Sequence, residues 1–353
     1  MGNEALLDLV SSFMGLDRSE VETIDKEVGG LFVSRFLQDR MRDTLDGRDS
    51  LTREAIRQFL APGLYSEVDP TNERANIIAG CPAINHSYPN SVTLTVTRTC
   101  HVKCTYCFRG DIITSEQTYD AAAVEAGLDW IKSHENIATV VVTGGDPFTL
   151  PQPALSKLIT ALDSIPTVHE VRLDTRVLTV KPSSVTSASE VLAALENAAG
   201  KMWLYSQINS AGEFHPRVDD AITAINRTGV PIVNQAVLLK GVNHTPALMR
   251  EMIYQGVRRG IRTDYLYLLD GGTEVDSPFN VSDDEIRDLF RELWSTRTSG
   301  LAKPRAIYVD PLTNTKAQLL VSPFEGNEGK LDKFLLDRRA KARRAAQNAD
   351  HQL

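Results

Sequence analysis

Residues 92–107 read VTLTVTRTCHVKCTYC and join two signals in one short stretch. The first half, residues 92–97, is an alternating run rich in β-branched side chains, which is typical of a β-strand. Three cysteines follow at once, at positions 100, 104 and 107. A strand that leads into a cysteine-rich loop predicts a chemical site at the carboxyl end of that strand, where barrel enzymes carry their active sites.

The cysteine spacing indicates a metal centre. The chain has four cysteines in 353 residues, and three of them lie within eight residues, which is no disulfide framework and favours a reducing compartment. Structural thiols seldom gather so densely. A zinc site needs four ligands, usually in C-x2-C pairs, whereas this loop gives C-x3-C-x2-C. Three thiolates on one loop suit a [4Fe-4S] cluster with one iron left open to a ligand that is not protein.

The rest of the chain alternates between strand and helix patterns. We expect strands over residues 138–142, 168–175, 202–208, 231–238 and 264–269, with helices between them such as residues 119–133, 185–198, 218–228 and 246–259. This order predicts right-handed βαβ units and a parallel sheet. A Rossmann fold is the rival, but its G-x-G-x-x-G does not follow the first strand.

Polar residues at or near the strand ends are expected to face a ligand, and they include Arg176, Asn209, Gln235 and Asp270. Thr143-Gly144-Gly145-Asp146-Pro147 follows the second strand. Its two glycines would let the backbone approach a ligand, and Asp146 offers a carboxylate to an ammonium group.

Two family resemblances rest on these motifs. CHVKCTYC at residues 100–107 resembles the signature of the radical S-adenosylmethionine (SAM) enzymes, and the GGDP of residues 144–147 resembles the motif that holds the SAM amino group. PIVNQAVLLKGVN at residues 231–243 is similar to the lysine 2,3-aminomutase family, as are HSYP at 86–89, DTR at 174–176 and YLY at 265–267. The second resemblance covers residues 25 to 326, approximately.

The resemblance implies an α/β fold with a partial (β/α)6 TIM-type barrel. It also implies an enzyme that uses a [4Fe-4S] cluster and SAM to make a 5′-deoxyadenosyl radical, and pyridoxal phosphate (PLP) to carry a migrating amino group. The expected reaction is 2,3-amino migration on a free amino acid resembling lysine or arginine, or on a derivative. A reductant such as flavodoxin or ferredoxin would supply the electron, and a homo-oligomer is left open.

The site residues carry over one by one. Cys100, Cys104 and Cys107 would hold the cluster. SAM would be bound by Gly144, Gly145, Asp146, Arg176, Asn209 and Gln235, with its adenine against the backbone around Tyr106 and Phe108. Arg109 would grip the substrate carboxylate with its guanidinium fork. Asp270 and Asp310 would hold the distal cation of the substrate, and Lys316 would be the lysine that the family joins to PLP.

The PLP site departs from the family pattern. The glycine-rich run before the PLP lysine is missing ahead of Lys316, and two arginines that bind the cofactor phosphate are replaced by Ser87 and Ser91. The family's C-terminal zinc cysteines are also absent. PLP binding is therefore left open. The alternative is a PLP-independent epimerisation or other radical rearrangement, in which the Cys81 thiol would return a hydrogen atom.

Three regions are expected along the chain. Residues 1–80 would form an N-terminal helical cap, including a helix at 31–45 and one that Thr52 caps. Residues 81–290 would form the barrel, and residues 291–353 a C-terminal extension that completes the active site and ends in a basic helical tail. The net charge of −8 disfavours nucleic-acid binding. No apolar run of about 18 residues is present, and the N-terminus has no secretory pattern, so no membrane contact and a cytoplasmic location are expected.

Overall fold

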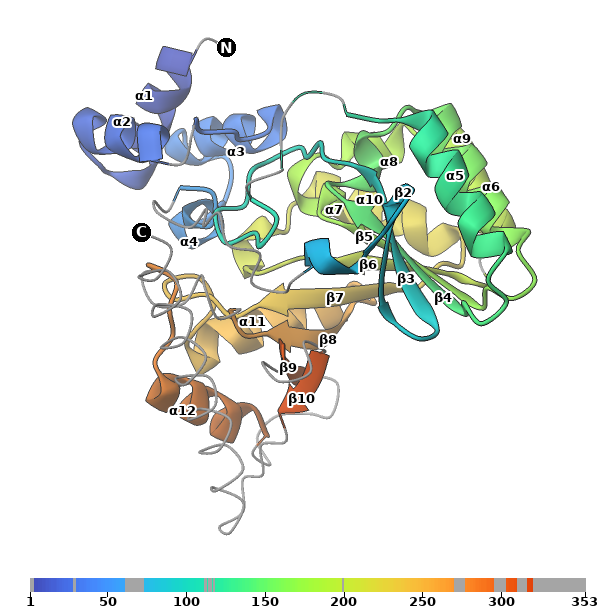
Figure 1. Cartoon of the computed structure of the whole chain (residues 1–353). Helices are drawn as coiled ribbons and strands as arrows, with labels where there is room; N and C mark the ends of the chain where they lie inside the picture. Colours follow the sequence, from blue (N-terminus) through green and yellow to red (C-terminus); the bar gives the residue numbers. More distant parts are fainter. Residues whose placement is uncertain are drawn as a thin grey trace, which may run out of the picture.

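The computed structural model describes residues 3–27, 30–60, 73–110, 113, 116, 118–198, 200–269, 277–294, 303–309 and 316–319. In this part of the chain a ten-stranded sheet runs through the molecule, with its strands side by side in chain order (Figure 1). The strands are β1 (Ile77–Ile78), β2 (Cys81–Tyr88), β3 (Ser91–Thr97), β4 (Thr139–Gly144), β5 (Glu170–Thr175), β6 (Met202–Ser206), β7 (Ile232–Val237), β8 (Arg262–Tyr267), β9 (Arg305–Val309) and β10 (Lys316–Leu319).

The middle of the sheet is parallel. Every neighbouring pair from β3 to β9 is parallel, whereas β1–β2, β2–β3 and β9–β10 are antiparallel. Within the described residues β1 and β10 do not pair, so the sheet is open. The predicted α/β fold with a partial barrel is confirmed. Six parallel strands were expected, and β9 adds a seventh, because the C-terminal extension pairs with β8.

Helices cover the outer side of the sheet. They are α5 (Ala121–Lys132), α6 (Gln152–Asp163), α7 (Val177–Val180), α8 (Ser183–Thr186), α9 (Ser189–Asn197), α10 (Pro216–Arg227), α11 (Pro246–Val257) and α12 (Asp283–Trp294), with short 3-10 turns η1 (Glu73–Asn76), η2 (Pro147–Thr149) and η3 (Ala211–Glu213). α5, α6 and α9 lie together at the right of Figure 1. Their apolar faces bury residues such as Leu128, Leu158 and Leu195 against the strands, which leaves the carboxyl ends of the strands free for a site.

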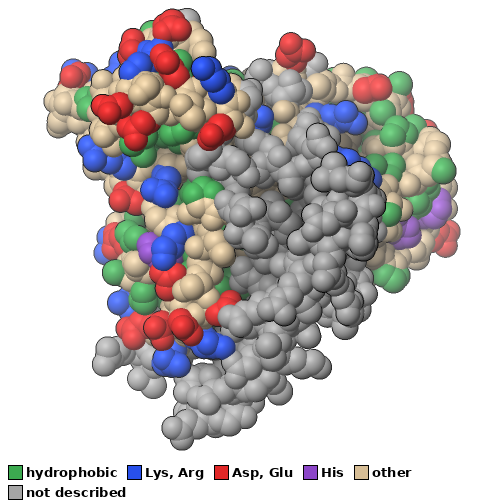
Figure 2. Space-filling model, turned by 60° about the vertical axis from the view of Figure 1, so that its left-hand side comes forward, with side chains coloured by type: hydrophobic (Ala, Val, Ile, Leu, Met, Phe, Trp, Pro, Cys, Tyr) green, Lys and Arg blue, Asp and Glu red, His purple; other side chains and the backbone are tan. Residues whose placement is uncertain are grey.

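Four helices precede the sheet: α1 (Asn3–Met14), α2 (Arg18–Glu27), α3 (Arg35–Leu45) and α4 (Arg53–Arg57). Thr52 caps α4 as predicted, since its side chain accepts a hydrogen bond from the Ala55 amide. The helix expected from residue 31 begins instead at Arg35, because the Ser34 side chain accepts from the Leu37 amide and sets the N-cap there. Charges of both signs are mixed over these helices, at the upper left of Figure 2.

The helices of the described residues are all too short or too polar to cross a bilayer.

Candidate active site

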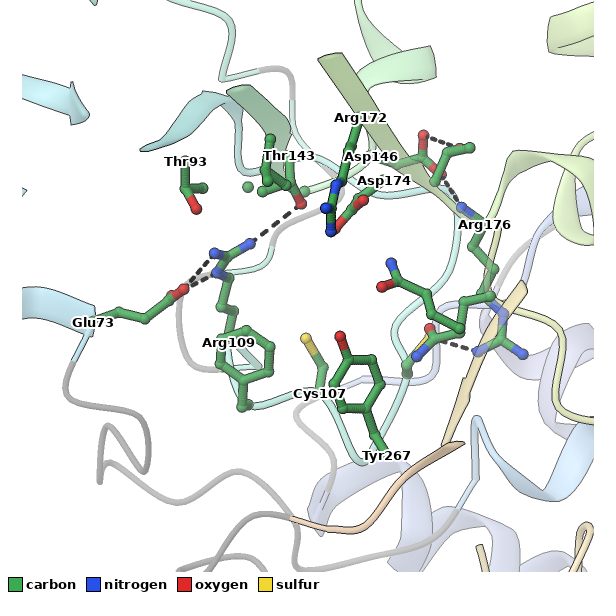
Figure 3. A pocket seen from close by; sticks show the side chains of 18 of the residues that line it. Glu73, Thr93, Cys107, Arg109, Thr143, Asp146, Arg172, Asp174, Arg176 and Tyr267 are labelled. Carbon is green, nitrogen blue, oxygen red and sulfur yellow. Dashed lines mark hydrogen bonds and ion pairs between the residues drawn. The ribbon is translucent and has the colours of Figure 1, made fainter. Parts of the chain in front are cut away.

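A cavity of about 600 Å³ lies against the parallel strands, and its lining reaches from the first residues of β3 and β4 to the loops after the carboxyl ends of the strands (Figure 3). It brings together most of the predicted site residues, although they are spread over more than 200 positions of the chain: Cys100, Cys104, Tyr106, Cys107, Phe108, Arg109, Gly144, Gly145, Asp146, Arg176, Gln235 and Lys316. Cys81 and Asn209 are not among its lining residues. Asp270 and Asp310 lie outside the described residues, as does the basic tail expected at the C-terminus.

The cysteine loop is held in place by backbone hydrogen bonds to the N-terminal helical segment. The Lys103 amide donates to the Phe32 carbonyl at 3.1 Å, and the Thr105 amide donates to the Gln58 carbonyl at 3.2 Å. The Cys107 amide donates to the Cys104 carbonyl at 3.1 Å, which folds the loop back on itself. These bonds fix the loop between two parts of the chain, so its three sulfur atoms have a defined placement.

The three thiols influence one another. Burial, and then the charge of Cys104, raise the pKa of Cys107 to about 12. The pKa of Cys100 is also raised, by burial first and then by Asp146, Cys107 and Cys104. A raised pKa means that a buried thiolate is costly without a positive partner, and the iron of a cluster would supply one.

The described side chains do not form a site for a single metal ion. Among the described residues, no three His, Cys, Asp or Glu side chains are gathered as they would be around one metal ion. A four-iron cluster takes its ligands at separate corners, so its thiolates stand farther apart than the ligands of one ion. All three cysteines line the same cavity, so they would be available together as ligands of such a cluster.

Gly144, the last residue of β4, and Gly145 have a packing role in addition to the expected one. Gly144 has a φ of +115°, and a Cβ there would lie 2.3 Å from the Thr97 carbonyl oxygen. A Cβ on Gly145 would lie 2.2 Å from the Thr99 carbonyl oxygen. The Gly145 amide donates to Thr97 at 2.6 Å. The glycines therefore let β4 come against the segment that leads into the cysteine loop, in addition to lining the cavity.

Replacing Gly145 by alanine should lower the free energy of unfolding by about 3 kcal/mol, because the methyl group would collide with backbone that cannot move aside. Gly200→Ala is the matched control, since nothing lies within 4 Å of its added Cβ, and it should change the free energy by less than about 0.5 kcal/mol. Urea denaturation measures both. Equal stability of the two variants would contradict the packing role.

Asp146 is engaged by the protein on both carboxylate oxygens. Its Oδ1 accepts from the Phe148 amide at 3.0 Å and from the Thr175 hydroxyl at 2.7 Å. Its Oδ2 accepts from the Arg176 amide at 2.9 Å. The carboxylate thus ties the end of β4 to the end of β5, and its contact with SAM stays a prediction.

Asn209 serves as a structural link beneath the cavity. It is fully buried, and its amide donates to Gln58 Oε1 at 3.0 Å and to the Tyr106 hydroxyl at 2.7 Å. Its Oδ1 accepts from the Val237 amide at 2.9 Å. Asn209 therefore connects the cysteine loop to the N-terminal helices, and its contact with SAM stays a prediction. Gln207, two positions earlier, lines the cavity.

Arg109 already holds a carboxylate. Its Nε and Nη2 donate to the two oxygens of Glu73 at 2.7 and 2.5 Å, and Nη1 donates to the Thr143 hydroxyl at 3.3 Å (Figure 3). Its guanidinium also lies 4.9 Å from the centre of the Phe108 ring. The fork has the geometry that grips a planar carboxylate. Glu73 was missed because it belongs to a short 3-10 turn with no motif around it.

Among the described carboxylates that line the cavity, Asp174 has an oxygen that accepts no hydrogen bond. Its Oδ1 is buried without a hydrogen-bond partner, and it lines the cavity beside Arg172 (Figure 3). Burial raises the pKa of Asp174, while Lys316, Gln235, Arg172 and Arg109 lower it. The alternating exposure of β5 places residues 170, 172 and 174 on one face, and this period of two was the signal that could have identified Arg172 and Asp174.

Lys316 reaches the cavity from the C-terminal extension. Its backbone amide donates to the Tyr88 hydroxyl at 2.9 Å, and its Nζ donates to the Tyr267 hydroxyl at 3.0 Å. The charge of Tyr267 and that of Asp174 raise the pKa of this lysine. Ser87 and Ser91 also line the cavity, and the Ser87 hydroxyl donates to Asn85 Oδ1 at 2.7 Å. Lys316 and the neutral hydroxyls of Ser87 and Ser91 therefore line the same cavity.

Cys81 is the first residue of β2 and lies in the hydrophobic core, where it is 6% exposed. Burial raises the pKa of its thiol. The described structure places this thiol in the core and not among the residues that line the cavity, and its role as a hydrogen donor stays a prediction.

Comparisons with known proteins agree on the family. The sequence model of the Radical SAM superfamily matches residues 94–252. The L-lysine 2,3-aminomutase of Haemophilus influenzae is 32% identical over 238 residues, which are 67% of this chain and 68% of the relative. The L-lysine 2,3-aminomutase of Escherichia coli is 29% identical over 284 residues, 79% of this chain and 80% of the relative. The glutamate 2,3-aminomutase of Clostridioides difficile is 29% identical over 319 residues, 89% and 74% of the two chains.

Proposed function

The chain belongs to the lysine 2,3-aminomutase family of radical SAM enzymes, and from this premise we propose that it moves an amino group between adjacent carbons of an amino acid with a cationic side chain. One observation carries the proposal: Lys316 lines the same cavity as the three cysteines of the predicted cluster site. A radical source and a PLP lysine must share one space if they are to act on one substrate.

When bound, the cluster and SAM supply a carbon radical, and PLP supplies a site for the migrating nitrogen. Cys100, Cys104 and Cys107 would hold the cluster through their thiolates, and Lys316 would hold PLP. A low-potential electron donor of the flavodoxin or ferredoxin class would provide the reducing electron. The residues around the cavity then bind and orient the substrate.

Two described side chains, Arg109 and Asp174, would bind the carboxylate and an N–H group of the substrate. The fork of Arg109 has the shape and charge for the substrate carboxylate, which would take the position that Glu73 now occupies. Asp174 Oδ1 would accept from a substrate N–H, since a buried acceptor without a partner costs free energy. The relatives include lysine and glutamate enzymes, and an acidic acceptor in the cavity favours a cationic substrate over an anionic one.

The test of the function is product analysis. The reconstituted enzyme is incubated with SAM, PLP and dithionite, and with lysine, arginine, glutamate or leucine in separate reactions. We expect a β-amino acid from lysine or arginine only, detected by chiral mass spectrometry. A β-amino acid from glutamate alone would contradict the cationic substrate, and inversion at Cα without migration would contradict the aminomutase reaction.

Two neutral serines, Ser87 and Ser91, stand where the family has the arginines that bind the PLP phosphate, and this leads to a second expectation. Ser91→Arg should tighten PLP binding by about tenfold, because one charge-assisted hydrogen bond to the phosphate contributes roughly 1.5 kcal/mol. The affinity is measured by titrating PLP and following its absorbance. Ser91→Ala is the control and should leave the affinity almost unchanged. If neither variant changes PLP affinity, the phosphate does not lie beside β3.

A further inference from the structure

A buried arginine touches the sulfur of one predicted cluster ligand. Arg176 is 7% exposed, and its Nη1 donates to Cys104 Sγ at 2.9 Å. The same guanidinium donates to the Tyr106 hydroxyl, and it lies 4.7 Å from the centre of the Phe59 ring. The sequence pattern had assigned Arg176 to SAM on account of its place at the end of β5. In the described structure its guanidinium contacts a sulfur atom of the cysteine loop, and its contact with SAM stays a prediction.

A buried carboxylate fixes the orientation of this arginine. Glu213 is 2% exposed and accepts from Arg176 Nη2 at 3.2 Å. The carboxylate cannot turn away, because Oε2 also accepts from the Thr179 hydroxyl at 2.8 Å and Oε1 accepts from the backbone N–H of Asn209 at 2.8 Å. The ion pair is therefore held with the arginine directed at the sulfur and the glutamate behind it.

Electrostatics determine what this contact does to a cluster. Reduction adds one electron, and the added negative charge is shared with the thiolate ligands. A cationic N–H donor at a thiolate stabilises the reduced state more than the oxidised one, since hydrogen bonds to the sulfurs and local charge set cluster potentials. The carboxylate of Glu213 offsets part of that effect from the far side of the guanidinium.

We propose that Arg176 raises the reduction potential of the cluster through its hydrogen bond to Cys104 Sγ, and that Glu213 positions the arginine and moderates its charge. This inference rests on the cluster of the proposed function but not on the reaction that the enzyme catalyses. It makes Arg176 a positioning and tuning residue, acting on the step in which a one-electron donor such as reduced flavodoxin passes its electron to the cluster.

The test is a redox titration of the reconstituted protein without SAM, followed by the EPR signal of the reduced cluster. Arg176→Gln should lower the ratio of reduced to oxidised cluster at a fixed potential by about tenfold, which corresponds to about 59 mV for a one-electron couple. Arg176→Lys keeps the positive charge and should recover most of the difference. An unchanged potential in Arg176→Gln, with SAM affinity reduced instead, would overturn the proposal and restore the role in SAM binding.

Two further variants separate tuning from folding. Arg40 is also buried, paired with a carboxylate, Asp49, and near an aromatic ring, but its nitrogens donate to Asp49 and to the Glu213 and Phe214 carbonyls rather than to sulfur. Arg40→Gln should therefore lower stability without shifting the potential. Glu213→Gln removes the opposing charge and should shift the potential upward, which tests the idea even if Arg176→Gln loses its cluster. A downward shift in Glu213→Gln would contradict the proposal, whereas wild-type protein without iron would contradict the cluster assignment itself.

Discussion

Cys104→Ala reduces SAM cleavage to background, because two thiolates cannot hold the cluster whose open iron binds SAM. The same loss is expected for alanine at Cys100 or Cys107, and no other single substitution in the cavity should have a larger effect. Arg176 would also be left with its Nη1 facing no sulfur. Iron and sulfide analysis after anaerobic reconstitution, with 5′-deoxyadenosine measured under dithionite, checks both parts of this expectation.

Cys81→Ala is the matched control for that experiment. It also replaces a cysteine by alanine, but this cysteine lies in the hydrophobic core and is not among the residues that line the cavity. We expect full iron content and undiminished SAM cleavage, with stability lower by about 1 kcal/mol. Full cleavage in Cys104→Ala, or loss of iron in Cys81→Ala, would mean that the cluster ligands have been assigned wrongly.

Lys316→Ala should abolish amino migration while leaving the cluster and SAM cleavage intact. The lysine side chain enters the cavity from β10 and takes no part in holding the cysteine loop. The wild-type protein should bind PLP as a chromophore that borohydride fixes to Lys316, and the variant should not. Peptide mass spectrometry after reduction locates the modified residue.

Lys316→Arg distinguishes the attachment of PLP from a purely electrostatic role. Arginine keeps the positive charge that faces Asp174, but it cannot form the covalent link. We expect it to be as inactive in migration as the alanine variant. Activity in Lys316→Arg would show that this position contributes only charge, and the PLP-dependent mechanism would then fail.

The sequence identified those parts of the site that depend on local pattern. The cysteine loop follows a strand directly, and the two glycines follow the next one, so topology alone brings them to the same edge of the sheet. The strand bounds were predicted to within a few residues for the same reason, since β-branched runs between amphipathic helices leave little freedom.

The contacts of individual side chains could not be predicted in this way. Asn209 stands at a strand end, but its amide turns to Gln58, a partner 151 positions away. Arg109 carries the expected charge, yet Glu73 that pairs with it lies 36 positions earlier in a turn without a motif. Pairings of this kind depend on the packing of the N-terminal helices and η1 against the sheet, which no local pattern records.

One measurement tests both the assignment of the cluster ligands and the radical chemistry. Wild-type protein, reconstituted with iron and sulfide, is reduced in the presence of SAM and lysine deuterated along its side chain. We predict 5′-deoxyadenosine that contains deuterium, because a radical formed in this cavity would take hydrogen from the amino acid held beside it. A protein that takes up the cluster but leaves SAM intact, or releases 5′-deoxyadenosine without deuterium in the presence of every amino acid tried, would contradict this account.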